Sequence, residues 1–393
     1  MFNKTVSGTL LIAGTTIGAG MLGIPLLTAG AGFLPAMGIT IGVWLFMLAT
    51  GLLFLEATLW MHEGANVLSM SRRFLGPLGK ITAGGTFLFL YYCLMVAYYA
   101  AGAPIFLAAL EWTLGISLSG PPGYLLYGLL FGGVVSLGLR FVDRINYFLM
   151  AAMFIAYFAL LGVGAPAVSN ERFVTSNWTS ALFAAPVLFS SFGFHNVIPS
   201  LVTYFKRDVK VLRRSILWGT FIPLLVFLAW QWLIIGAVPP DAIHDALETG
   251  RPATAALQSL VGHPWIMAFG QFFAFFAIIT SMLGVAFSMV DFLADGLKVK
   301  GKRVLLTLAV FLPPFLFAAL DPAIFVTALG FAGGFGEAFL NGLLPVAFVW
   351  VGRYTRKLGG KPQLPGGAPV LWVLGILAVS VAVAEIIFIL RGE

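Results

Sequence analysis

The segment from Gly14 to Pro25, GTTIGAGMLGIP, carries four glycines within an apolar stretch that is long enough to form a helix. Each glycine in a helix interior costs about 1 kcal/mol relative to alanine. We therefore predict that the helix unwinds near Gly18 and leaves backbone N–H and C=O groups free. Free N–H groups at a helix N-terminus favour a carboxylate, and free carbonyls accept hydrogen bonds from an ammonium group. The alternative is that the glycines form a close-packed face between helices.

A second interruption lies between Phe189 and Pro199, where FSSFGFHNVIP places serines, a glycine, a histidine and an asparagine in an apolar stretch. Neither interruption contains Asp, Glu, Lys or Arg. Backbone groups and helix dipoles suffice to hold the two charges of a zwitterion, so the pattern favours an α-amino acid over a sugar acid or a simple ion. The segment from Gly18 to Gly23 also matches GxGxxG, but a dinucleotide site requires a preceding strand and a βαβ unit, and neither is expected here.

The predicted substrate site lies at these two interruptions. The amides of Gly18, Ala19 and Gly20 are expected to hold a carboxylate, and the rings of Phe192 and Phe194 to contact an aromatic side chain. Because the chain contains 37 phenylalanines, each ring also has the alternative of facing lipid or the core. The candidate substrate-binding residues are Thr15, Thr16, Gly18, Ala19, Gly20, Tyr98, Ser190, Ser191, Phe192, Gly193, Phe194 and His195.

The composition places these segments in a membrane protein. Of the 393 residues, 60% are hydrophobic and only 9% are charged, whereas soluble domains carry about 25% charged residues. A soluble enzyme, a disordered chain and a disulfide scaffold are therefore excluded, and the single cysteine, Cys93, also excludes CxxC chemistry. A membrane span needs roughly 20 apolar residues. Eleven stretches of that kind predict helices near 5–33, 35–61, 79–111, 123–139, 145–166, 181–205, 211–238, 264–296, 303–320, 322–352 and 369–390.

The basic residues predict the orientation of these helices. If the N-terminus lies inside, all the lysines and arginines except Arg172, Arg251 and Arg391 fall in alternate, cytoplasmic loops. This follows the positive-inside rule and predicts an N-in, C-out topology. It also explains the net charge of +7 without a nucleic-acid partner, and none is expected. The long outer segment near 239–263 is expected to be either a short helix or a solvated connector.

The two interruptions each open a block of five predicted spans. Because five is odd, the second block must enter the membrane from the opposite side. Interrupted helices at matching positions of two halves indicate an inverted-repeat secondary transporter with its site near the bilayer midplane. We predict a first repeat over 1–166, a second over 181–353 and an additional helix over 369–390, all within an all-α membrane fold.

Three ionisable residues lie at membrane depth near the predicted site: Glu56, His195 and Glu337. Such residues are functional candidates by default, and an imidazole titrates close to neutral pH. All three are therefore candidates for carrying a coupled proton. The alternatives are a structural histidine and carboxyl groups that are paired between helices.

These motifs resemble those of the bacterial tyrosine and tryptophan permeases. The run from Gly14 to Leu22, with Pro25, is similar to their first helix, and Ser191 to His195, with Pro199 and Ser200, is similar to their sixth. Further similarity lies at Glu56, at Ser281 to Asp295 and at Phe311 to Pro314. The resemblance covers nearly the whole chain. It implies the amino acid/auxin permease superfamily and a LeuT-like fold, in which a tyrosine such as Tyr98 often binds the substrate carboxylate.

The same resemblance raises a second possible coupling ion. Ala277, Thr280 and Ser281 match a pattern that completes a sodium site in LeuT-like transporters, with carbonyls of Gly14 and Ile17 as further ligands. The alternative is that Thr280 and Ser281 bond carbonyls of their own helix, as hydroxyl residues in membrane helices usually do.

The sequence thus predicts a proton-driven symporter that imports aromatic amino acids, tyrosine first, across a bacterial inner membrane by alternating access. Sodium coupling on the same fold and an ion channel are the alternatives. No enzyme is expected, because no nucleophile and base are clustered and no HExxH or phosphate loop occurs. No cofactor beyond the coupled ion is expected. The expected partners are the amino acid and the lipid bilayer, and the protein is expected to be a monomer.

Overall fold

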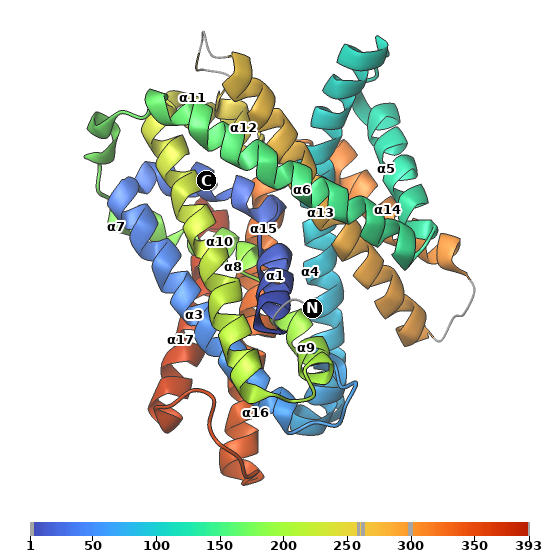
Figure 1. Cartoon of the computed structure of the whole chain (residues 1–393), viewed down its shortest axis with the longest axis vertical. Coiled ribbons are helices and arrows are strands. Elements are labelled where there is room, and N and C mark those ends of the chain that lie inside the picture. Colours follow the sequence, from blue (N-terminus) through green and yellow to red (C-terminus); the bar gives the residue numbers. More distant parts are fainter. Residues whose placement is uncertain (1–3, 258–259, 261–263, 298–301, 392–393) are drawn as a thin grey trace.

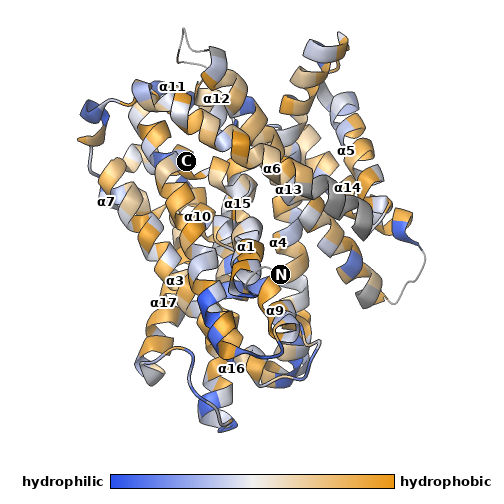
Figure 2. Ribbon diagram, in the orientation of Figure 1, coloured by the Kyte–Doolittle hydropathy of each residue, from blue (hydrophilic) through white to orange (hydrophobic). Residues whose placement is uncertain are grey.

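A computed structural model describes residues 4–257, 260, 264–297 and 302–391, and every regular element within these residues is helical. Nine helices are long and apolar enough to cross a membrane, and one bent pair of shorter helices raises the number to ten within the described residues. In Figure 2 the helices are mostly coloured as hydrophobic, whereas hydrophilic residues gather in loops at the helix ends.

In the part of the chain that the structure describes, eight long helices follow the apolar stretches of the sequence. They are α3 (Phe33–Leu59), α4 (Val67–Leu114), α5 (Gly120–Ser136), α6 (Leu139–Gly164), α10 (Val209–Ala237), α13 (Pro264–Leu297), α14 (Arg303–Leu320) and α17 (Gly367–Arg391). Helix α5 occupies the fourth predicted span but has only 17 residues and is not among the nine. The number of eleven spans therefore stays a prediction.

Three spans are composed of shorter pieces. The first contains α1 (Lys4–Thr16), η1 (Ala19–Leu22), α2 (Ile24–Thr28) and η2 (Ala29–Ala31). The sixth predicted span contains α7 (Trp178–Leu182), α8 (Ala185–Ser191), η5 (His195–Val197) and α9 (Ile198–Tyr204). The tenth contains α15 (Phe325–Phe331), the π-helix η7 (Ala332–Leu343), α16 (Leu344–Trp350) and η8 (Val351–Thr355).

One boundary differs from the prediction for a local reason. Helix α4 begins at Val67 and not near residue 79, because a short amphipathic segment precedes the span. Gly76 joins the two parts with φ of 79°, a left-handed value that glycine adopts without strain, and Pro77 follows it. The predicted start of the span thus coincides with this kink.

The long segment after α10 is partly helical. It contains α11 (Pro240–Glu248) and α12 (Ala253–Ala256), and both contact α2. The first of the two alternatives, a short helix, is therefore confirmed. The remaining short elements, η3 (Ala165–Ala167) and η4 (Asn170–Phe173), connect α6 to α7.

The first span lies in the middle of the bundle. Helix α1 packs along α10, and the two lie next to each other in Figure 1. The interrupted part, η1, contacts α8 and α13, and α8 in turn packs against η7. The broken spans therefore meet in the core, away from the apolar outer surface.

Candidate functional site

The first predicted break is confirmed. Helix α1 ends at Thr16, Gly18 is extended (φ −165°, ψ −159°), and a 3₁₀ turn begins at Ala19. The two halves of the span are bent by 48°. The hydroxyls of Thr15 and Thr16 bond the carbonyls four residues back, at 2.8 and 2.9 Å, so both side chains are bonded within their own helix. On the other side of the break, the indole N–H of the buried Trp230 donates to the carbonyl of Met21 over 3.0 Å.

The second predicted interruption is also confirmed. Helix α8 ends at Ser191, and the residues from Phe192 to Phe194 are not helical. Both phenylalanines are fully buried. The ring of Phe192 packs edge-on against Phe227 at 4.8 Å between centroids. Ser190 and Ser191 both donate to the carbonyl of Val187 over 2.8 Å.

The two breaks are in direct contact. A Cβ atom placed on Gly20 would lie 2.7 Å from Oγ and 3.1 Å from Cα of Ser191, so only glycine permits this approach. The amide of Ala19 donates to Oγ of Ser281 on α13 over 3.1 Å. Ser281 also lies beside the phenol of Tyr98. The structure thus brings Ala19 and Gly20 of the first break together with Ser191, Ser281 and Tyr98. Thr15 is exposed and is not part of this group.

A buried carboxyl group lies against the second break. Glu337 projects from the π-helix η7, and a Cβ atom on Gly193 would lie only 2.5 Å from its Oε1. The side-chain amide of Asn341 donates to Oε2 of Glu337. Next to it, Asn196 donates to the hydroxyl of Tyr91 over 3.2 Å. π-helical turns often occur at functional sites, and this one places a carboxyl at the unwound backbone.

His195 lies on the far side of the same break. Its Nε2 is 3.0 Å from the hydroxyl of Thr50, and the ring of Phe54 meets it edge-on at 5.9 Å. The residue is fully buried, and its Nδ1 has no hydrogen-bond partner among the described residues. An unpaired buried nitrogen is unusual, and it leaves one polar atom of this imidazole available beside the break.

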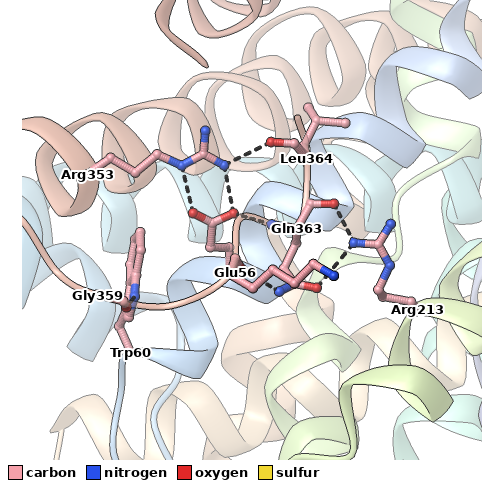
Figure 3. A network of polar contacts seen from close by, with 8 residues as sticks. Glu56, Trp60, Arg213, Arg353, Gly359, Gln363 and Leu364 are labelled. Carbon is pink, nitrogen blue, oxygen red and sulfur yellow. Dashed lines mark hydrogen bonds and ion pairs between the residues drawn. The ribbon is translucent and has the colours of Figure 1, made fainter. Parts of the chain in front are cut away.

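Glu56 lies in a separate network at the end of the bundle where α3 and η8 terminate (Figure 3). Nε and Nη2 of Arg353 each donate to one oxygen of Glu56 over 2.7 Å. The amide of Gln363 donates to Oε2 over 2.6 Å, and Arg213 donates to the carbonyl of Gln363, also over 2.6 Å. Glu56 therefore fastens α3, η8, α10 and the segment before α17 to one another. Glu56 lies apart from the two breaks. Its contacts with Arg353 are those of a carboxyl group that is paired between helices, the alternative to a proton carrier.

Removing the charge of Glu56 is expected to destabilise the protein. Its side chain is 5% exposed and that of Arg353 13%, so Glu56→Gln leaves a buried guanidinium without its counter-ion. Breaking a buried pair in this way costs about 3–5 kcal/mol. We expect a clearly lower midpoint of thermal unfolding for the purified protein in detergent.

Two variants test this expectation. Glu63→Gln removes an exposed carboxyl from the adjacent loop and should leave the midpoint unchanged. The double variant Glu56→Leu/Arg353→Met should recover stability, because apolar replacement of a whole buried pair is often neutral. An unchanged midpoint in Glu56→Gln would contradict a structural role for the pair.

The structure describes contacts for residues of the predicted sodium set, and their role as ion ligands stays a prediction. Thr280 donates to the carbonyl of Ala277 over 3.1 Å. This is a hydrogen bond to a carbonyl of its own helix, which is the alternative to a sodium ligand. Ser281 accepts the Ala19 amide, so it caps the break. Gly14 faces Met150 of α6, since a Cβ there would lie 2.7 Å from the methionine methyl group. The amide of Ile17 continues the helix by donating to Ala13 over 2.8 Å.

Several residues of the site were missed by sequence reasoning. Asn196 and Asn341 carry a usable signal, because each is an amide at membrane depth beside an already selected residue, His195 or Glu337. Tyr91 and Trp230 carry none, since aromatic residues occur throughout the chain. Only the packing of the helices identifies them.

An all-helical bundle with two broken spans that meet in its core is an arrangement found in membrane transport proteins. The chain belongs to the tryptophan/tyrosine permease family, whose sequence profile matches residues 1–385. This confirms the resemblance identified from the sequence motifs.

Relatives cover nearly the full length of the chain. It is 33% identical to the tyrosine-specific transport system 1 of Haemophilus influenzae, over 99% of this chain and 98% of the relative. It is 30% identical to a tryptophan-specific transport protein of Pseudomonas aeruginosa, over 97% and 94%. The low affinity tryptophan permease of Escherichia coli is 29% identical, over 83% and 82%.

Proposed function

We propose that this protein is a secondary-active symporter that imports aromatic amino acids, with tyrosine preferred and tryptophan and phenylalanine accepted. The contact between the two unwound segments, at Gly20 and Ser191, is the observation that carries the proposal. The tyrosine and tryptophan specificities named for the relatives support the choice of substrate, and their bacterial sources support a place in the inner membrane.

The first break supplies the carboxylate site of this proposal. The amide of Ala19 is already aimed at an oxygen, the hydroxyl of Ser281, and the adjacent Gly20 lies against Ser191 at the second break. A substrate carboxylate would replace the Ser281 hydroxyl and gain the positive end of the following helical turn. Tyr98, beside Ser281, is placed to donate to the same carboxylate.

The second break supplies the remaining contacts. Carbonyls left free at the end of α8 would accept the ammonium protons, and the rings of Phe192 and Phe194 would contact the aromatic side chain. Both rings are fully buried among residues of the protein. Substrate entry therefore requires the second break to move, which accords with alternating access.

Glu337 is the best-placed proton carrier. It is 5% exposed, lies against Gly193 and accepts a hydrogen bond from Asn341. A change in its protonation would act directly on the unwound backbone that binds the substrate. Glu56 is instead paired with Arg353, so it is less suited than Glu337 to carry the coupled proton.

The membrane architecture of the proposal comprises eleven spans in a LeuT-like 5+5 inverted repeat, with α5 as the fourth span and α17 outside the repeats. The chain is N-in and C-out. Its halves, 1–166 and 181–353, would rock against each other around the two breaks that contact each other, at residues 17–20 and at residues 191–194 (the paired breaks). The protein acts as a monomer.

Uptake of labelled tyrosine into proteoliposomes tests the function. We expect saturable accumulation when the interior is alkaline, unchanged when choline replaces sodium at clamped pH. Accumulation that requires sodium would make sodium the coupling ion at Ser281 and Thr280. Non-saturable flux, or uptake indifferent to both gradients, would contradict a symporter.

Replacing His195 separates its two predicted roles. His195→Ala removes the contact with Thr50 and opens a void between Phe54 and Phe194, so we expect uptake to fall several-fold at every pH. Initial rates measured between about pH 5 and 8 check this. A changed pH profile would make His195 the proton carrier in place of Glu337.

A further inference from the structure

A second carboxyl group, Glu385 on α17, lies in a cavity that is separate from the paired breaks. The residue is 3% exposed. Its side chain runs along two glycines of the tenth span: a Cβ atom on Gly330 would lie 2.5 Å from Oε1, and one on Gly334 would lie 2.6 Å from Cβ of Glu385. Any larger residue at Gly330 would displace the carboxyl group.

The carboxyl of Glu385 has no hydrogen-bond or ion-pair partner among the residues described by the structure. A buried carboxyl without a partner is costly, and this one borders a cavity of about 180 Å³. The cavity lies between α2, α15, α17 and the end of α7. Its lining includes Leu27, Phe183, Thr327, Phe331, Glu385 and Phe388.

The cavity combines one carboxyl group with aromatic walls. Aromatic faces attract cations, and a nearby carboxylate adds a charge-assisted hydrogen bond. The ring of Phe183 already accepts such a contact, since the guanidinium carbon of Arg391 lies 4.8 Å from its centroid. Arg391 itself is exposed, so the ionisable group that lines the cavity is the carboxyl of Glu385.

The volume limits the size of the ligand. An apolar cavity of about 150 Å³ accommodates benzene, so 180 Å³ admits one ring with a short chain. We propose that this cavity is a second ligand site, distinct from the transport site, which binds the ammonium ion of a small aromatic amine with Glu385 as its counter-ion. Such a ligand would touch both α2, one half of the broken first span, and α17.

Fluorine NMR of 4-fluorobenzylamine with the purified protein in detergent tests the proposal. We expect wild-type protein to bind the amine, with or without saturating tyrosine, and to bind the neutral 4-fluorobenzyl alcohol more weakly by at least about tenfold. Glu385→Gln should weaken amine binding by a similar factor. Thr327→Trp enlarges an exposed residue of the lining and should also weaken amine binding, because the indole would fill the cavity. This variant keeps the proposal testable if Glu385→Gln does not fold.

Glu171→Gln is the matched control, because it removes an exposed carboxyl from the loop before α7, and it should bind the amine like wild type. Equal binding of the alcohol, wild-type affinity in Glu385→Gln, or displacement of the amine by tyrosine would each overturn the proposal. Displacement would place the amine at the paired breaks. It would leave the proposed transport function untouched.

Discussion

Replacing Gly20 with valine is expected to reduce tyrosine uptake by at least about 100-fold, the loss that a displacement of roughly 1 Å causes in a positioned site. Even a Cβ atom at this position would lie 2.7 Å from Oγ and 3.1 Å from Cα of Ser191. The backbone of the second break cannot yield without moving α8. The two breaks are therefore forced apart, and the amide of Ala19 and the carbonyls at the end of α8 can no longer contact the same substrate molecule. Initial uptake rates into proteoliposomes, normalised to protein content, give the measurement.

Gly30→Val is the control in the same broken span. A Cβ atom on Gly30 meets nothing within 4 Å, so this variant should transport at a rate close to wild type. If Gly20→Val transported as well as Gly30→Val, the contact between the breaks would have no part in substrate binding.

The second large effect is expected for Glu337→Gln. Glutamine keeps the shape of the side chain and an oxygen that accepts the hydrogen bond from Asn341, but it cannot exchange a proton. We expect accumulation driven by a pH gradient to fall to the level of empty liposomes. Exchange of external labelled tyrosine for internal unlabelled tyrosine should persist, because the binding groups at Ala19 and Gly20 remain.

The control for this variant is Glu111→Gln, which neutralises an exposed carboxyl near the end of α4 and should accumulate tyrosine normally. Normal gradient-driven accumulation by Glu337→Gln would exclude Glu337 as the proton carrier. Loss of both accumulation and exchange would instead assign it to substrate binding.

The spans and both breaks were predictable because their causes are local. Hydropathy alone indicates the long helices, and four glycines between Gly14 and Pro25 are enough to predict an unwound segment. The kink at Gly76 also has a local cause, namely a glycine in the left-handed conformation followed by a proline. It lies just before the predicted start of the span.

The partners of these segments were not predictable, because they depend on packing between distant parts of the chain. Glu56 and Glu337 are equivalent in sequence terms, both single carboxyls in apolar helices. Only the structure shows that Arg353 pairs with the first, while the second faces Gly193. Likewise, Ser281 was expected beside a sodium ion but accepts the amide of Ala19, which no spacing in the sequence indicates.

Equilibrium binding to the purified protein tests the central claim most directly, namely that the paired breaks hold both charges of an aromatic amino acid. Labelled tyrosine bound to the wild-type protein would be challenged with analogues that each lack one charged group. We predict that phenylalanine and tryptophan displace the label, whereas tyramine, without the carboxylate, and 3-(4-hydroxyphenyl)propionate, without the ammonium group, do not. Displacement by tyramine at the same concentration as by phenylalanine would contradict this prediction, because the amides of Ala19 and Gly20 would then have no carboxylate to bind.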